Sequence, residues 1–174
     1  MVVQSSFGGG EIHGSRLKAE IGQLLVDKGY QPIPEIHQVV GTSLTNATMI
    51  RGVQAENLTE VSPFTLVSGR ILSSGDPSRV AMIGIGMADR LKAKVGDTIL
   101  LRGRKFVVIG IFKNGSYEDD QAWISLTDAQ KLLNYGTDVS VYYIPDGGKL
   151  NEGETLVKGI SVVRRGDCAN DYGN

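Results

Sequence analysis

The sequence is poor in the residues that most often bind metals or form disulfides. Its 174 residues include one cysteine, Cys168, and two histidines, His13 and His37. One cysteine cannot form an internal disulfide, and these three residues match no recognised spacing of metal ligands. We therefore expect no metal site and no cofactor. His37 falls in a predicted strand, where a lone histidine is usually an ordinary side chain rather than a ligand or a base.

The sequence also lacks a charge excess and a long apolar run. It carries 18 basic and 19 acidic residues, so its charge gives no reason to expect a nucleic-acid partner. No run approaches the roughly 18 apolar residues that cross a bilayer, and the start of the chain lacks a signal-peptide pattern. The chain is therefore predicted to be soluble as it stands, which would also hold for a domain cut from between two membrane spans.

A catalytic constellation is missing as well. Neither histidine has a serine or cysteine partner in its sequence context, so we assign no catalytic residue. Two glycine-rich stretches, at residues 8–10 and 84–86, raise the alternative of a small nucleotide-dependent enzyme. Neither has the spacing of a P-loop or a dinucleotide fingerprint, and Asp89 stands where the third glycine of the fingerprint would be. Residues 118–120, Glu-Asp-Asp, lack the order of a calcium loop and are predicted to be a solvated loop tip. Because paired carboxylates occur only in this run, an enzyme is disfavoured.

Glycine is abundant, and the clearest structural signal is a β-hairpin. The 23 glycines are nearly double the usual share of about 7%, which favours short strands and frequent turns. Two apolar runs, residues 98–101 and 106–112, flank Gly103-Arg104, which we interpret as a type II′ turn that places Leu101 opposite Phe106. Both faces of this hairpin are apolar, so we expect cover on both sides. The residues of its second face are Leu100, Val107, Ile109 and Ile111.

The remaining pattern alternates short strands and short helices. Strands are predicted at residues 2–3, 35–40, 47–54, 64–67, 79–85, 122–125, 139–144 and 160–163. A helix capped by Ser15 and ended by Gly29 is predicted over residues 15–28, with further helices at residues 87–94, 127–133 and 152–158. The helix at residues 127–133 begins with a Thr-x-x-Gln capping box at Thr127. Residues 56–63 are predicted to be a polar connector.

Five segments together resemble one protein family. They are IRGVQ at residues 50–54, SGR at 68–70, RVAMIGIGMADRLKAKVGDTILLRGRKFVVIGIF at 79–112, DDQAWISLTDAQKLL at 119–133 and DVSVYYIP at 138–145. In this order they resemble the extracytoplasmic core domain of MacB-like ABC transporter permeases, which are related to the FtsX and lipoprotein-releasing permeases. The resemblance covers about half of the chain, and residues 1–45 and 146–174 follow it only in general layout.

The resemblance implies an α+β fold with two lobes. Residues 1–62 and 138–174 would form a porter-like lobe, in which discontinuous segments of the chain build one α+β sheet. Residues 63–137 would form an inserted, mainly β lobe with short helices. The alternative left open by the residues alone is a free-standing β-rich binding module.

The resemblance also implies a non-catalytic role in transport. The chain would be the soluble extracytoplasmic domain of a permease subunit of the cell membrane, and it would couple cytoplasmic ATP hydrolysis mechanically to export or to the action of a partner. ATPase activity would belong to a separate nucleotide-binding domain or subunit. The implied partners are the cognate ABC ATPase, a second permease subunit in a homodimer or heterodimer, and an extracytoplasmic adaptor or substrate, without nucleic acid. The resemblance assigns no partner-binding residue.

Overall fold

The fold is α+β, as predicted. The computed structural model describes residues 2–5, 16–41, 47–145, 155–157 and 160–163. The strands are β1 (Val2–Ser5), β2 (Ile33–Val40), β3 (Thr48–Val53), β4 (Thr65–Gly69), β5 (Val80–Gly84), β6 (Thr98–Leu101), β7 (Arg104–Lys113), β8 (Gln121–Ser125), β9 (Val141–Tyr143), β10 (Thr155–Val157) and β11 (Ile160–Val163). The helices are α1 (Ala19–Asp27), α2 (Leu58–Val61), α3 (Ile85–Leu91) and α4 (Leu126–Leu133), with the 3-10 turns η3 (Ala55–Asn57) and η4 (Tyr117–Asp120).

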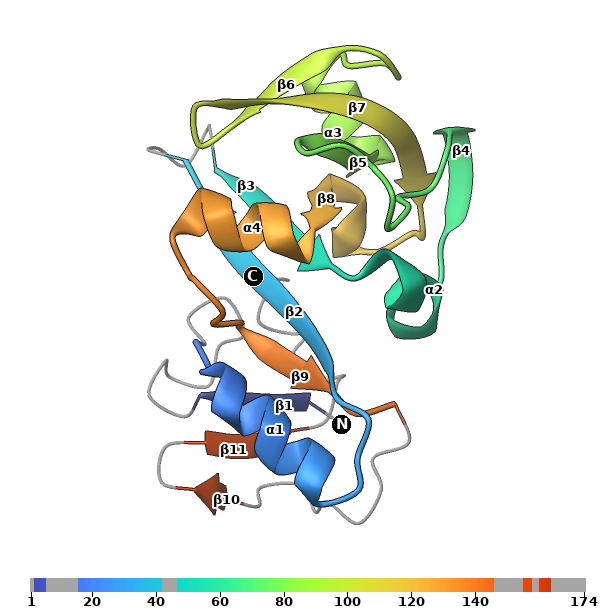
Figure 1. Cartoon of the computed structure of the whole chain (residues 1–174). Coiled ribbons are helices and arrows are strands. Elements are labelled where there is room, and N and C mark those ends of the chain that lie inside the picture. Colours follow the sequence, from blue (N-terminus) through green and yellow to red (C-terminus); the bar gives the residue numbers. More distant parts are fainter. Residues whose placement is uncertain (1, 6–15, 42–46, 146–154, 158–159, 164–174) are drawn as a thin grey trace.

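The strands form one mixed sheet that has two parts. Its order is β10-β11-β1-β9-β2-β3-β8-β5-β7-β4, and β6 pairs with β7 beside this path. We call β10, β11, β1 and β9 the terminal half-sheet, and β3, β8, β5, β7, β4 and β6 the central half-sheet. In Figure 1 the terminal half-sheet lies below and the central half-sheet above, and β2 runs between them. Segments from both ends of the chain therefore lie in the same half-sheet.

Strand β2 changes partners halfway along its length. Residues 33–35 pair with β9, where Glu35 lies opposite Val141, whereas residues 36–40 pair with β3, where Ile36 lies opposite Gly52. At the change of partner the Ser140 hydroxyl accepts a hydrogen bond of 3.0 Å from the backbone N–H of His37. We call the point between Glu35 and Ile36 the joint.

Two apolar cores lie on opposite faces of the sheet. The first contains Ile36 from β2, Tyr142 from β9 and Ala129 from α4. Helix α1 approaches this face closely, because a Cβ on Gly22 would lie 2.8 Å from the Tyr142 ring. The second core contains Trp123, whose ring stacks on that of Phe112 at 3.6 Å between centroids. Because side chains alternate along β8, the residues on either side of Trp123 face the first core.

The β6–β7 hairpin forms, but its turn lies one residue earlier than predicted. Arg102 and Gly103 are the two turn residues, with φ angles of 48° and 76°, and Leu101 pairs with Arg104. Positive φ at both positions is typical of a type I′ turn, whose twist matches that of the strands, so the predicted II′ turn and its register are wrong. Moving the turn by one residue shifts the pairing by two, and the predicted buried face is therefore unchanged.

Cover on both faces of the hairpin was also predicted, and this is only partly correct. Leu100 is 65% exposed and Val107 is 43% exposed, so the outer face near the turn is open. Farther along β7, Ile109 is an extra residue between the pairs that Val108 and Gly110 make with β5. This bulge reverses the alternation of faces, and the next apolar residue, Ile111, is buried in the first core.

Other predicted elements also differ from the structure, and the helix predicted at residues 87–94 is α3 at Ile85–Leu91. The first helix begins at Ala19, because Leu17 instead pairs with Val139 through backbone hydrogen bonds of 2.6 and 2.9 Å. Its predicted cap, Ser15, lies outside the described residues. Gly29 follows the end of the helix with a φ of 90°, as predicted. The cap of α4 is Ser125, whose hydroxyl accepts the N–H of Asp128, so Thr127 is not the cap. Residues 155–157 form a strand instead of a helix, and residues 56–63 contain α2, whose Leu58 is fully buried.

Candidate functional site: a buried polar network

Three charged or ionisable side chains meet on one face of the sheet. Glu35 and His37 are two residues apart on β2, so they point to the same face, and Arg51 on β3 lies directly opposite His37. Gly52, which follows Arg51 on the opposite face, packs against Ala129 of α4. The polar side chains therefore lie on the face away from α4.

Glu35 and Arg51 form a bidentate ion pair. The Arg51 Nε donates to Glu35 Oε1 at 2.6 Å and Nη2 donates to Oε2 at 2.8 Å, and both side chains are 1% exposed. The guanidinium also lies 4.8 Å from the centroid of the Trp123 ring, which is its neighbour in the parallel β3–β8 register. Two parallel charge-assisted bonds fix the relative orientation of the two planar groups.

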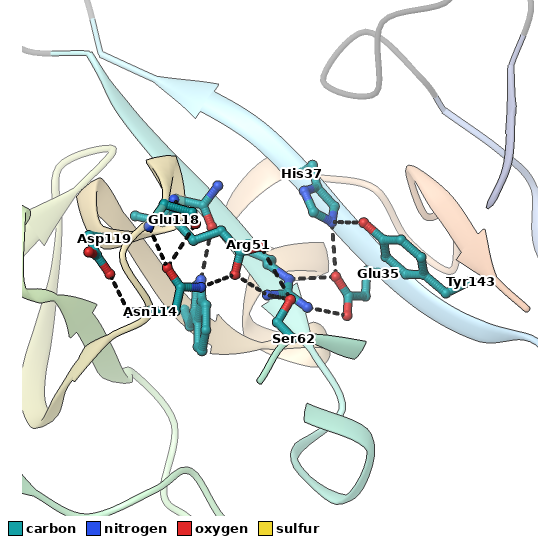
Figure 2. Close-up of polar contacts among 11 residues, drawn as sticks. Glu35, His37, Arg51, Ser62, Asn114, Glu118, Asp119 and Tyr143 are labelled. Atoms are coloured by element: carbon teal, nitrogen blue, oxygen red, sulfur yellow. Dashed lines mark hydrogen bonds and ion pairs between the residues drawn. The ribbon is translucent and has the colours of Figure 1, made fainter. Parts of the chain in front are cut away.

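The network continues from Arg51 into the central part of the chain (Figure 2). Arg51 Nη1 donates to the Ser62 hydroxyl at 2.9 Å and lies 3.6 Å from Glu118 Oε2. Ser62 follows directly after helix α2, and the Ser62 hydroxyl donates in turn to Glu118 Oε1 at 3.3 Å. The Asn114 amide donates to Glu118 Oε2 at 2.9 Å. These contacts tie β3 to the segment after β7.

The acidic run 118–120 is not the solvated loop tip that was predicted. The Glu118 side chain is 12% exposed and belongs to the network. Asp119 accepts the backbone N–H groups of Asn114 and Gly115 at 2.7 and 3.0 Å, which stabilises the turn after β7. Asp120 alone is at the surface, where it pairs with Arg90 at 3.1 Å. Among the described residues, no group of three or more His, Cys, Asp or Glu side chains is arranged to hold a metal ion.

His37 is buried and hydrogen-bonded, which its isolation in the sequence did not indicate. Its Nε2 lies 2.9 Å from Glu35 Oε1 and 3.3 Å from the hydroxyl of Tyr143 on β9. Because an ionised carboxylate only accepts, Nε2 carries the ring proton and donates to Glu35. A signal was present in the sequence: Glu35 and Arg51 are charged residues within β-favouring runs, where unpaired burial is costly. Their pairing depends on the β2–β3 register, which the sequence alone did not supply.

The environment keeps this network charged at Glu35 and Arg51 and neutral at His37. Burial is the largest single influence on Glu35 and acts to raise its pKa, but the Arg51 charge and the hydrogen bonds from Arg51 and His37 together outweigh it, and the pKa falls to about 2. Burial likewise opposes the charged form of Arg51, and the Glu35 carboxylate nevertheless raises the Arg51 pKa above its ordinary value. For His37, burial lowers the pKa more than the hydrogen bond to Glu35 raises it. The arrangement holds elements in place and offers no activated nucleophile.

Acid is expected to destabilise the protein through Glu35 and His37. The carboxylate of Glu35 favours folding above its ordinary pKa of 4.5, and this contribution, about 3 kcal/mol, is lost as the pH falls from 4.5 towards 2. Neutral His37 adds a loss in the same direction that begins below its ordinary pKa of 6.5. Urea unfolding between pH 7 and pH 3 measures both. A parent curve as flat below pH 4.5 as the curve of the Glu35→Gln variant would contradict this prediction.

The glycines at residues 84–86 have a packing role. Gly84 ends β5 and Gly86 lies in α3, and a Cβ on Gly84 would collide with the backbone carbonyl of Asp119 in η4, while one on Gly86 would lie 3.1 Å from the same oxygen. The backbone that a phosphate would approach is therefore covered by η4. The glycines at residues 8–10 lie outside the described residues.

Substituting Gly84 tests this packing role. Gly84→Ala should destabilise the domain by about 1 to 3 kcal/mol in urea unfolding, because η4 must move to admit the methyl group. The matched control is Gly75→Ala, since a Cβ at Gly75 meets nothing within 4 Å, and its stability should stay within about 0.5 kcal/mol of the parent. A Gly84→Ala variant of parental stability with altered nucleotide binding would support the enzyme alternative.

The surface has wider hollows away from the network. One groove, of about 890 Å³, lies between the end of β2 and the hairpin turn and is lined by Val39, Leu100, Arg102 and Tyr135 among others. None of the described helices combines the length and apolar character required to span a bilayer.

Comparisons with known proteins identify one family. The sequence matches the family model of the MacB-like periplasmic core domain over residues 4–158. The periplasmic region of MacB from Actinobacillus actinomycetemcomitans is similar in structure, with a TM-score of 0.63 and 17% identity, covering 86% of this chain and 75% of that one. The extracellular domain of the noncanonic ABC-type transporter YknZ from Gram-positive bacteria has a TM-score of 0.58 and 18% identity, covering 74% of this chain and 73% of that one. No curated protein matches the sequence.

Proposed function

The chain belongs to the family of MacB-like periplasmic core domains, the extracytoplasmic part of ABC transporter permeases, and we propose that it passes ATP-driven movement of membrane helices to a substrate or partner outside the membrane. It would do so without chemistry of its own, because ATP hydrolysis would belong to a separate nucleotide-binding domain or subunit. Its partners would be that ATPase, reached through the membrane part of the permease, and a second permease subunit. An extracytoplasmic adaptor or substrate would meet the exposed surface.

The observation that carries the proposal is the pairing of β1 with β11. These strands are antiparallel, with Val2 opposite Val163, so the chain enters and leaves the domain at neighbouring points of one half-sheet. This arrangement suits a domain inserted between two consecutive membrane helices, since one helix would end where the domain begins and the next would begin where the domain ends. Movement of either helix would act first on the terminal half-sheet.

We also propose the two-lobe division, with residues 1–62 and 138–174 in one lobe and residues 63–137 in the other. Strand β8, inside residues 63–137, pairs with β3, which lies outside them. The two lobes would therefore share one sheet, and a force on the terminal strands would reach the hairpin region through backbone hydrogen bonds.

The location is tested on the full-length permease in membranes. Ser74→Cys in a Cys168→Ser background places one thiol at an exposed position of this domain. A membrane-impermeant maleimide should label it in right-side-out spheroplasts. Labelling only after the cells are opened would overturn the extracytoplasmic assignment.

The coupling is tested on the same variant, reconstituted with its ATPase in nanodiscs and spin-labelled at the introduced thiol. The distance between the two labels of a permease dimer should differ between the nucleotide-free state and an ATP-trapped state. An unchanged distance distribution would contradict mechanical coupling. The competing function, a free-standing binding module, predicts a complete reading frame without flanking apolar helices of about 20 residues.

A further inference from the structure

The two half-sheets are joined through a single strand, with no residue of that strand shared between them. In the strand ladders, residues 33–35 of β2 pair with β9 and residues 36–40 pair with β3. Ser140, just before β9, is bonded to the backbone of Glu35 and of His37. The backbone ladders therefore stop on either side of the joint and do not overlap across it. Strands twist and bend readily where few neighbours restrain them, so β2 alone would set the angle between the half-sheets only loosely.

On one face of the sheet the joint is covered by apolar side chains. The first core contains Tyr142 from β9 and Ile36 from β2, together with residues from α1 and α4. Apolar burial holds these elements against one another, but it is non-directional. It favours contact between the half-sheets without specifying one angle.

On the opposite face the polar network crosses the joint. Tyr143 belongs to β9 in the terminal half-sheet, and its hydroxyl lies 3.3 Å from His37 Nε2, beyond the joint. His37 contacts Glu35 on the near side at 2.9 Å, and Glu35 returns across the joint to Arg51 on β3 through two bonds. Figure 2 shows this sequence of contacts from Tyr143 to Arg51 and on to Ser62 and Glu118. The two Arg51–Glu35 bonds and the His37–Glu35 bond constrain direction as well as distance.

We propose that the Glu35–Arg51 pair, together with His37 and Tyr143, is a conformational lock that fixes the angle between the terminal and central half-sheets. The lock specifies one geometry at the joint, while the apolar cores supply the stability of each half-sheet. Buried ion pairs are weak contributors to stability compared with apolar replacements of similar volume, and fixing one arrangement is a role that they perform in other proteins. Without the lock, both half-sheets stay folded and β2 flexes between Glu35 and Ile36.

The test measures the angle as a distance between two spin labels on the whole 174-residue chain. One label is placed on α1 by Val26→Cys and the other on α3 by Asp89→Cys, both exposed, in a Cys168→Ser background. The lock is removed by combining Glu35→Gln with Arg51→Met, which takes away both charges together. The matched control is Arg16→Gln, which breaks an exposed ion pair outside the network.

The parent and the Arg16→Gln control should give one narrow distance distribution in pulsed electron paramagnetic resonance. The double variant should give a broader distribution with a shifted mean, while its circular dichroism spectrum stays that of the parent. A distribution as narrow as the parent's would overturn the proposal. If the double variant does not fold, Tyr143→Phe keeps the aromatic ring and removes the hydroxyl that contacts His37. It should broaden the distribution in the same direction, and a narrow distribution there would equally overturn the proposal.

Discussion

Replacing Arg51 by methionine is expected to destabilise the protein by about 3 to 5 kcal/mol, because the Glu35 carboxylate then stays buried without its charged partner. The size of this effect follows from the burial, since both side chains are 1% exposed. Water cannot replace the two lost hydrogen bonds unless the joint opens. Urea unfolding at pH 7 measures the loss, and Trp123, the only tryptophan, reports it by fluorescence because it lies against Arg51.

The control for this variant is Arg90→Met. Arg90 pairs with Asp120, whose side chain is 61% exposed, and surface pairs of this kind contribute about 0 to 1 kcal/mol. Adding Glu35→Gln to Arg51→Met should recover most of the lost stability, because the fully buried carboxylate is then gone and Glu118 keeps its hydrogen bonds from Ser62 and Asn114. A single variant that loses less than the Arg90→Met control would mean that Glu35 needs no partner.

Replacing Trp123 by alanine is expected to destabilise the protein by about 3 to 5 kcal/mol. Its ring is fully buried, stacks on Phe112 and meets the edge of Phe64 at 5.4 Å between centroids. Removing it leaves a cavity that two rigid aromatic rings cannot fill by a small shift. It also removes the surface beneath the Arg51 guanidinium.

Chemical unfolding followed by circular dichroism measures this loss, since the fluorescent residue is gone. Leu100→Ala is the matched control, because Leu100 is large and apolar but 65% exposed, and its replacement should stay within about 0.5 kcal/mol of the parent. Equal losses in the two variants would contradict the assignment of Trp123 to the second core.

The strands and helices of the chain were largely predictable, because short apolar runs between glycines specify local structure. The hairpin marks the limit of this local information. Gly103 suits either position of a two-residue turn, and the choice depends on whether Arg102 accepts a φ of 48°, which the strand twist decides. The helix predicted around Thr155–Val157 was wrong for a different reason, since pairing with β11 overrides a weak helical pattern.

The candidate site was not predictable in the same way. Glu35, His37 and Arg51 are separated in sequence and meet only through the β2–β3 register. Glu118 joins them from a run that resembles a solvated loop tip. Each residue considered alone favours an exposed position, and only the pairing makes burial of all of them favourable.

The order of the strands also determines when each part of the sheet can form during synthesis. β1 is made first, yet its neighbours β9 and β11 come from the last third of the chain. The central strands pair mainly with one another, within residues 48–125. Because contacts distant in sequence form slowly, the central half-sheet can fold while β1 still waits for its partners. The half-sheet nearest the two ends of the domain is then the last to close, and that closure brings the two ends of the domain together.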